Sequence, residues 1–89
     1  MDNQRLRNLT TGRLHTKIQD IYEDLEYILG EKGLMTHQIP KVLRAETPWL
    51  KKTITDPRFW DDAYDPTHAG NTPLPEPTDK EREAMFTNV

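Results

Sequence analysis

The chain has 89 residues, of which 34% are hydrophobic and 30% are charged. A chain of this length forms one domain with a thin core, because it buries only about 60% of the surface that it exposes when unfolded. It contains neither cysteine nor serine, which excludes disulfides, thiolate metal sites and the commonest nucleophiles. No run approaches the roughly 20 apolar residues that cross a bilayer, and no apolar signal peptide begins the chain, so we expect no membrane association.

The net charge of −3 is distributed in alternating blocks. Residues 1–18 and 32–53 are basic, whereas residues 19–31 and 54–89 are acidic. Such blocks attract one another, and small chains often gain stability by self-association, so we expect a homo-oligomer. The sequence pI near 5.5 argues against a general nucleic-acid binder, which needs a strongly basic domain.

The clearest periodic pattern runs from residue 14 to residue 29. Apolar residues recur there at steps of three and four, which places them on one helical face. They are Leu14, Ile18, Ile21, Leu25 and Ile28. We predict a long first helix that is capped by Thr10 or Thr11 and ends at Gly30. Its acidic residues are expected to face water, and they are Asp20, Glu23, Asp24 and Glu26.

Two or three short helices are predicted after Gly30. Thr36 is a suitable cap for a second helix of about ten residues, and Thr47 followed by Pro48 indicates the start of a third. Asp56 and Pro57 repeat this pattern before a single helical turn. The side chains expected to be buried are Met35, Ile39, Val42, Leu43, Trp49, Leu50 and Ile54.

The chain changes character at residue 61. Prolines at alternate positions from 73 to 77 favour extended polyproline geometry, so this segment is predicted to be a strap. It lies over the helices if Leu74 finds a pocket and is mobile otherwise. Thr78 and Glu81 form a capping-box pattern for a short final helix, which is expected to expose Met85 and Phe86.

The sequence therefore predicts an all-α fold with no strand. Residues 1–60 form a small helical core domain. Residues 61–89 form an acidic, proline-rich strap that ends in a short helix.

The first candidate site lies between residues 10 and 17. It combines the hydroxyls of Thr10 and Thr11 with the basic side chains of Arg13, His15 and Lys17 at a predicted helix N-terminus. Free backbone amides and the helix dipole favour phosphate or carboxylate there, and arginine binds phosphate in bidentate fashion. The alternative is a plain capped helix with solvated basic residues, since the segment matches neither a Walker motif nor a GxGxxG loop.

Two further segments have suitable chemistry. Thr36 and His37 stand at the predicted start of the second helix, which has a basic face. Arg58, Phe59 and Trp60 place aromatic rings beside a cation, which suits stacking on a nucleobase and neutralising its phosphate. The same residues are equally suited to a small core.

Metal binding and catalysis are only weakly indicated. His15, His37 and His68 show no paired spacing of metal ligands. A histidine near a phosphate can act as a general base, but most histidines at helix starts have no such role. We therefore expect a binding protein without cofactor or metal, not an enzyme.

Five short segments form a distinctive combination. They are Leu9–Thr16, Met35–His37, Pro48–Leu50, Asp56–Asp61 and Tyr64–His68. With these segments, residues 8–86 resemble a family of small accessory proteins encoded by tailed bacteriophages. The resemblance implies a biological setting and no mechanism. Phage accessory proteins of this size often antagonise host defences. They do so by sequestering a nucleotide second messenger or by blocking a defence protein.

The leading hypothesis is a phage-type anti-defence protein of the host cytoplasm. It would be a helical oligomer that sequesters a phosphate-bearing nucleotide signal. One alternative is a protein–protein inhibitor that occupies a host defence enzyme through its acidic surfaces. Another is a structural or regulatory component of the virion. The sequence leaves open whether the target is a small molecule or a protein.

Overall fold

A computed structural model describes residues 1–60 and 63–87 of the chain. The helices of this part are α1 (Asn3–Thr11), α2 (Ile18–Leu29), α3 (Ile39–Thr53) and α4 (Asp79–Thr87). The 3-10 turns η1 (Thr36–Gln38) and η2 (Pro57–Phe59) flank α3. The described residues contain no strand, only an isolated bridge between Asp2 and Asn71, so the all-α prediction is confirmed.

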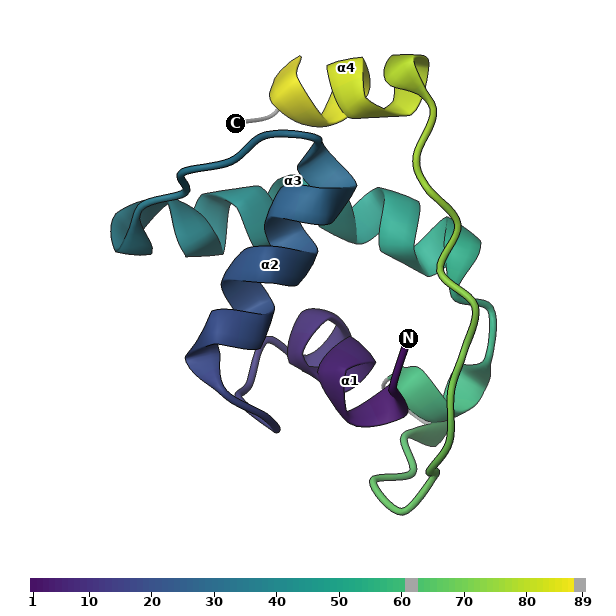
Figure 1. The fold of residues 1–89 in the computed structure, drawn as a ribbon. Helices are drawn as coiled ribbons and strands as arrows, with labels where there is room; N and C mark the ends of the chain where they lie inside the picture. Colours follow the sequence, from purple (N-terminus) through teal and green to yellow (C-terminus); the bar gives the residue numbers. More distant parts are fainter. Residues whose placement is uncertain (61–62, 88–89) are drawn as a thin grey trace.

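The helices enclose one core (Figure 1). α2 crosses in front of α3, α1 packs against both, and α4 lies across the same two helices at the opposite end. The buried core residues are Leu6, Leu9, Ile21, Leu25, Ile28, Leu29, Val42, Trp49, Leu50, Ile54, Phe59 and Met85. No helix in the described ranges is both long enough and apolar enough to span a membrane.

The start of the chain differs from the prediction. Residues 3–11 form a separate helix, which Asp2 caps by accepting a hydrogen bond from the Gln4 amide at 2.7 Å. It ends at Gly12, whose φ of +70° is a left-handed conformation that terminates helices. The predicted long helix begins only at Ile18, so Leu14 lies in a loop and is 55% exposed. Thr10 and Thr11 therefore stand at a helix C-terminus, and the predicted helix start at these residues is wrong.

The second and third predicted helices are one continuous helix, α3, which passes through Pro48. Proline has no amide to donate, so one backbone hydrogen bond is missing there. Burial of Trp49 and Leu50 nevertheless holds the helix in place, and the Thr47 hydroxyl donates to the Leu43 carbonyl at 2.7 Å. Met35, which was predicted to be buried, is 62% exposed.

The acidic residues of α2 do not all face water. Asp24 is buried and accepts two hydrogen bonds from the Arg5 guanidinium, at 2.7 and 3.1 Å. Burial raises the pKa of Asp24, and the hydrogen bonds to Arg5 oppose that shift. Glu26 accepts hydrogen bonds from the amides of Gly33 and Leu34 at 2.7 and 3.1 Å. These carboxylates therefore join α1 to α2 and fix the loop after α2.

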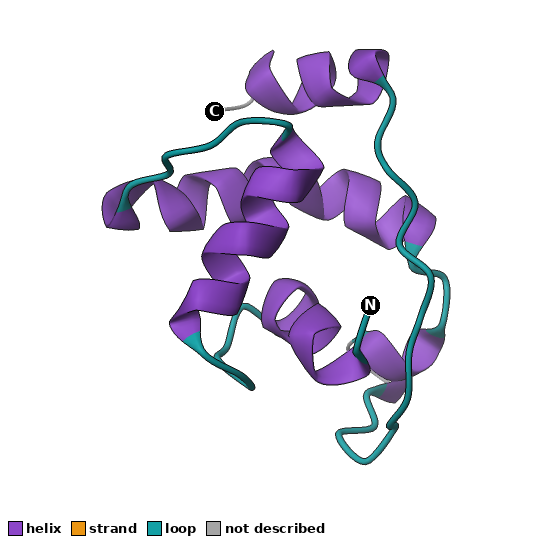
Figure 2. Ribbon diagram, in the orientation of Figure 1, coloured by secondary structure: helices purple, strands orange, loops and turns teal. Residues whose placement is uncertain are grey.

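The strap, described from residue 63, runs along one side of the helices to α4 (Figures 1 and 2). Near its start, Nη2 of the buried Arg7 donates to the carbonyls of Asp65, at 2.8 Å, and His68. Further on, Met1 and Thr72 exchange backbone hydrogen bonds at 2.8 and 3.0 Å. The first residues of the chain therefore hold the strap against α1.

The end of the strap and α4 pack against the same core. Leu74 packs there, as the prediction allowed, and Met85 is buried, so the expectation of an exposed Met85 is wrong. The predicted capping box is confirmed: the Thr78 amide donates to Glu81 at 2.8 Å, and the Glu81 amide donates to the Thr78 hydroxyl at 3.2 Å.

Candidate functional site

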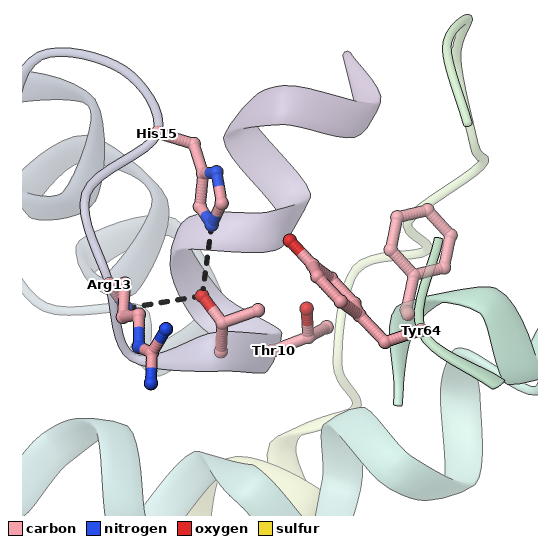
Figure 3. Close-up of a pocket in the computed structure, with 6 residues that line it drawn as sticks. Thr10, Arg13, His15 and Tyr64 are labelled. Atoms are coloured by element: carbon pink, nitrogen blue, oxygen red, sulfur yellow. Dashed lines mark hydrogen bonds between the residues drawn. The ribbon is translucent and has the colours of Figure 1, made fainter. Parts of the chain in front are cut away.

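A cavity of about 300 Å³ opens beside the C-terminal end of α1 (Figure 3). Its walls come from α1, from the loop between α1 and α2, from η2 and from the start of the strap. The lining residues are Thr10, Thr11, Arg13, His15, Phe59 and Tyr64. The first four belong to the site predicted from the sequence, and the structure brings them together.

A buried asparagine holds the loop that carries the basic residues. Asn8 Oδ1 accepts hydrogen bonds from the amides of His15, at 2.7 Å, and Thr16, at 3.3 Å. Its Nδ2 donates to the Thr16 hydroxyl at 2.7 Å. These amides are therefore not free to bind an anion, unlike those of the predicted helix start. Sequence analysis did not identify Asn8, because an asparagine outside a cap or turn pattern gives no local signal.

Hydrogen bonding determines which ring nitrogen of His15 carries a hydrogen. The Thr11 hydroxyl donates its one proton to the Arg7 carbonyl at 2.6 Å. The same oxygen lies 3.2 Å from Nε2 of His15 and 3.1 Å from the Arg13 amide, so it accepts from both (Figure 3). Nε2 of His15 therefore carries a hydrogen, and Nδ1 is left to bind a further partner.

Two polar groups of the cavity have no protein partner. In the described part of the chain, the Arg13 guanidinium makes no hydrogen bond or ion pair. The Thr10 hydroxyl oxygen is buried and also has no hydrogen-bond partner. A buried hydroxyl without a partner is costly, so a ligand that bonds to it gains free energy.

Two aromatic rings supply the apolar surface of the cavity. Phe59 is buried, with its centroid 5.3 Å from the His68 ring and 5.7 Å from the Arg7 guanidinium carbon. Tyr64 comes from the strap and lies beside Thr10 (Figure 3). Sequence analysis missed Tyr64, because only the folding of the strap onto α1 brings it to the cavity.

Three other predicted site residues do not line this cavity. Lys17 is exposed and immediately precedes α2. Thr36 is 2.6 Å from the Tyr22 hydroxyl, and that hydrogen bond links η1 to α2. His37 is exposed in η1, a turn too short to act as a helix N-terminal anion site.

Arg58 and Trp60 also have structural partners outside the cavity. Arg58 donates from Nη2 to Asp56 Oδ2 at 2.7 Å, and this bonding lowers the pKa of Asp56 to about 2. Trp60 packs on the core and donates from Nε1 to the Ile54 carbonyl at 2.8 Å. The third predicted segment thus contributes only Phe59 to the cavity. In residues 1–60 and 63–87, no cluster of histidine and carboxylate side chains is arranged to hold a metal ion.

These features define a small helical domain with a ligand-sized cavity that combines a free cation, a histidine and aromatic rings. Residues 1–61 match the model of a family described as a domain of unknown function (DUF7736), and the chain belongs to that family. The matched part includes every residue of the cavity lining except Tyr64. No curated protein and no solved structure shows a significant match to the chain.

Proposed function

We propose that the chain binds and sequesters a small phosphate-bearing nucleotide in the cavity beside α1. The supporting observation is the unpaired Arg13 guanidinium, which shares this cavity with His15 and two aromatic rings. A guanidinium grips phosphate through paired hydrogen bonds, and aromatic rings stack on nucleobases. The cavity volume of about 300 Å³ is at the lower end of the range of small-molecule sites, roughly 300 to 1,000 Å³.

The end of α1 restricts where a phosphate can lie. Carbonyl groups at a helix C-terminus carry partial negative charge, which repels anions. The phosphate therefore lies on the side of the loop, against the Arg13 guanidinium. The base then lies near Tyr64, where helix carbonyls accept hydrogen bonds from amino or hydroxyl groups of the ligand.

Replacing Arg13 with alanine is expected to weaken nucleotide binding by about 10- to 100-fold, the equivalent of one charged hydrogen-bonding group. The thermal midpoint should stay within about 1 °C of wild type, because an exposed side chain without partners adds little to stability. Titration calorimetry against cyclic and linear nucleotides measures the affinity. Arg44→Ala is the matched control, since Arg44 is an exposed arginine on α3 that does not line the cavity.

Two results would contradict the proposal. One is the absence of binding across the nucleotide panel at micromolar protein concentration. The other is an equal effect of Arg13→Ala and Arg44→Ala, which would mean that nucleotides bind through general surface charge.

The biological setting that we propose is phage anti-defence in the host cytoplasm, on the basis of the resemblance to phage accessory proteins. Sequestration leaves the nucleotide chemically unchanged, whereas catalysis converts it to a product. After incubation with the protein and denaturation, the nucleotide should be recovered intact by mass spectrometry. Recovery of a cleaved nucleotide would instead indicate an enzyme.

Self-association is part of this proposal. Leu14, between the two basic residues of the cavity, is 55% exposed, and Ile18 is 52% exposed. A second subunit that covers these side chains would also close the open side of the cavity. Light scattering should give a dimer or larger species, and Leu14→Glu should dissociate it. A monomer at all concentrations would contradict self-association and leave the nucleotide proposal intact.

An acidic groove supports a second candidate function, inhibition of a host protein. A depression of about 520 Å³ beside the end of α2 is lined by Glu23, Glu26 and Glu31 together with Tyr27 and Lys32. Carboxylates around a half-exposed ring suit a basic segment of a partner protein. A host protein that is captured stoichiometrically from nuclease-treated lysate, and lost with Glu23→Lys/Glu31→Lys, would favour this function. Capture that is insensitive to these substitutions would argue against it.

A further inference from the structure

We infer that the ligand is a nucleoside monophosphate, with its one phosphate at Arg13 and the base beside Tyr64 and Thr10. This inference rests on the proposed function and narrows its ligand class. It follows from three properties of the cavity: its charge, its size and its unsatisfied hydroxyl.

The charge of the cavity matches one phosphate. Among the described residues of the lining, Arg13 is the only arginine or lysine. Arg58 is already bonded to Asp56, and Lys17 is not in the lining. One phosphate monoester carries a charge of about −1.5 to −2 at neutral pH, which the single guanidinium neutralises in part. Further phosphates would meet no additional cation and would lie close to the negative end of α1.

The size of the cavity fits one nucleotide unit. Its volume of about 300 Å³ is at the minimum for small-molecule sites, roughly 300 Å³. A dinucleotide would leave its second base and second phosphate outside, where the lining provides no partner. The strap and the end of α1, which Arg7 holds together, bound the cavity on two sides.

The Thr10 hydroxyl lies beneath the cavity wall, and the base can bond to it once the side chain that covers it moves aside. Its oxygen is buried and has no partner in the protein, although a hydroxyl can both donate and accept. The edge of a nucleobase presents donors and acceptors in one plane, so it can satisfy this group. Inorganic phosphate at Arg13 would leave the hydroxyl unsatisfied.

Titration calorimetry of the 89-residue chain tests the inference with nucleoside 5′-monophosphates, triphosphates, cyclic dinucleotides, a nucleoside and inorganic phosphate as separate ligands. We expect at least one monophosphate to bind tenfold more tightly than its triphosphate, its nucleoside, any cyclic dinucleotide and inorganic phosphate. Thr10→Val keeps the shape of the side chain and removes the hydroxyl. This substitution should weaken binding of the monophosphate about fivefold or more and leave binding of inorganic phosphate unchanged. The thermal midpoint of the variant should equal or exceed that of wild type.

The outcomes separate the two levels of the proposal. If a triphosphate or a dinucleotide binds more tightly through Arg13, the monophosphate inference is overturned and the nucleotide proposal stands. Equal affinity for a monophosphate and inorganic phosphate, or no effect of Thr10→Val, overturns the assigned base position. If no nucleotide binds, both fail.

Discussion

Replacing Glu46 with methionine is expected to stabilise the protein by about 4 kcal/mol at pH 8. Glu46 is fully buried on α3, and neither of its carboxyl oxygens has a hydrogen-bond partner. Burial raises the pKa of this carboxyl to about 9, because a charge without a partner is costly in apolar surroundings. Methionine has a similar length and no charged group, so it fits the site without this cost.

The same carboxyl makes stability depend on pH. Its pKa of about 9 in the folded state exceeds the ordinary value of 4.5, so between these values the folded state binds the additional proton. Stability from this group is fully present below pH 4.5 and is lost as pH rises toward 9, at about 1.4 kcal/mol per pH unit. Between pH 6 and pH 8.5, the free energy of unfolding should therefore fall by about 3 kcal/mol.

Chemical denaturation at these two pH values measures the effect. Wild type should lose stability, and Glu46→Met should lose far less. Glu83→Met is the control, because Glu83 is an exposed glutamate on α4, and its pH dependence should equal that of wild type. If wild type and Glu46→Met show the same pH dependence, Glu46 does not hold a proton in the folded state.

Replacing Arg7 with alanine is expected to lower the free energy of unfolding by about 3 to 5 kcal/mol. The side chain is fully buried, donates to the strap carbonyls of Asp65 and His68, and lies over the Phe59 ring. Alanine leaves a void beside that ring, removes the donor to the Asp65 carbonyl, and leaves the His68 carbonyl with only the 3.4 Å hydrogen bond from Asn3. Denaturant titration measures the loss, and Arg44→Ala, at an exposed position, should change stability by no more than about 0.5 kcal/mol.

A second variant separates the strap contact from core volume. Arg7→Met keeps most of the volume and removes the donors together with the charge over Phe59, and Nε and Nη1 of Arg7 have no partner to lose. Global stability should fall less than in the alanine variant. Amide hydrogen exchange of residues 64–72 should nevertheless increase, and ligand affinity should fall because Tyr64 is no longer fixed. Unchanged protection of that segment would show that Arg7 does not hold the strap.

Local patterns predicted several elements well. The apolar steps from residue 18 to 28 form the buried face of α2 after its exposed first residue, and Gly30 ends that helix with a φ of +78°. The Asp56 cap and the capping box at Thr78 are also present. Each of these features is decided by residues within one or two helical turns, so the sequence contains the necessary information.

Helix α1 was not predicted, because its buried face is largely polar. Asn3, Arg7 and Asn8 are buried beside only two leucines, so hydrophobic periodicity gives a weak signal. Their partners lie in the strap or in the following loop, and burial of polar groups is tolerated only when such partners are present.

The sequence by itself determined the all-α class and the starts of η2 and α4. It also determined the grouping of Thr10, Thr11, Arg13 and His15, which are near neighbours in the chain. The tertiary structure decided that this group follows a helix instead of starting one, and that Tyr64 completes its cavity. It also decided that Arg7 and Glu46 are buried. The reason is physical: a cap or a periodic face depends on adjacent residues, whereas burial of a charge depends on which distant segments surround it.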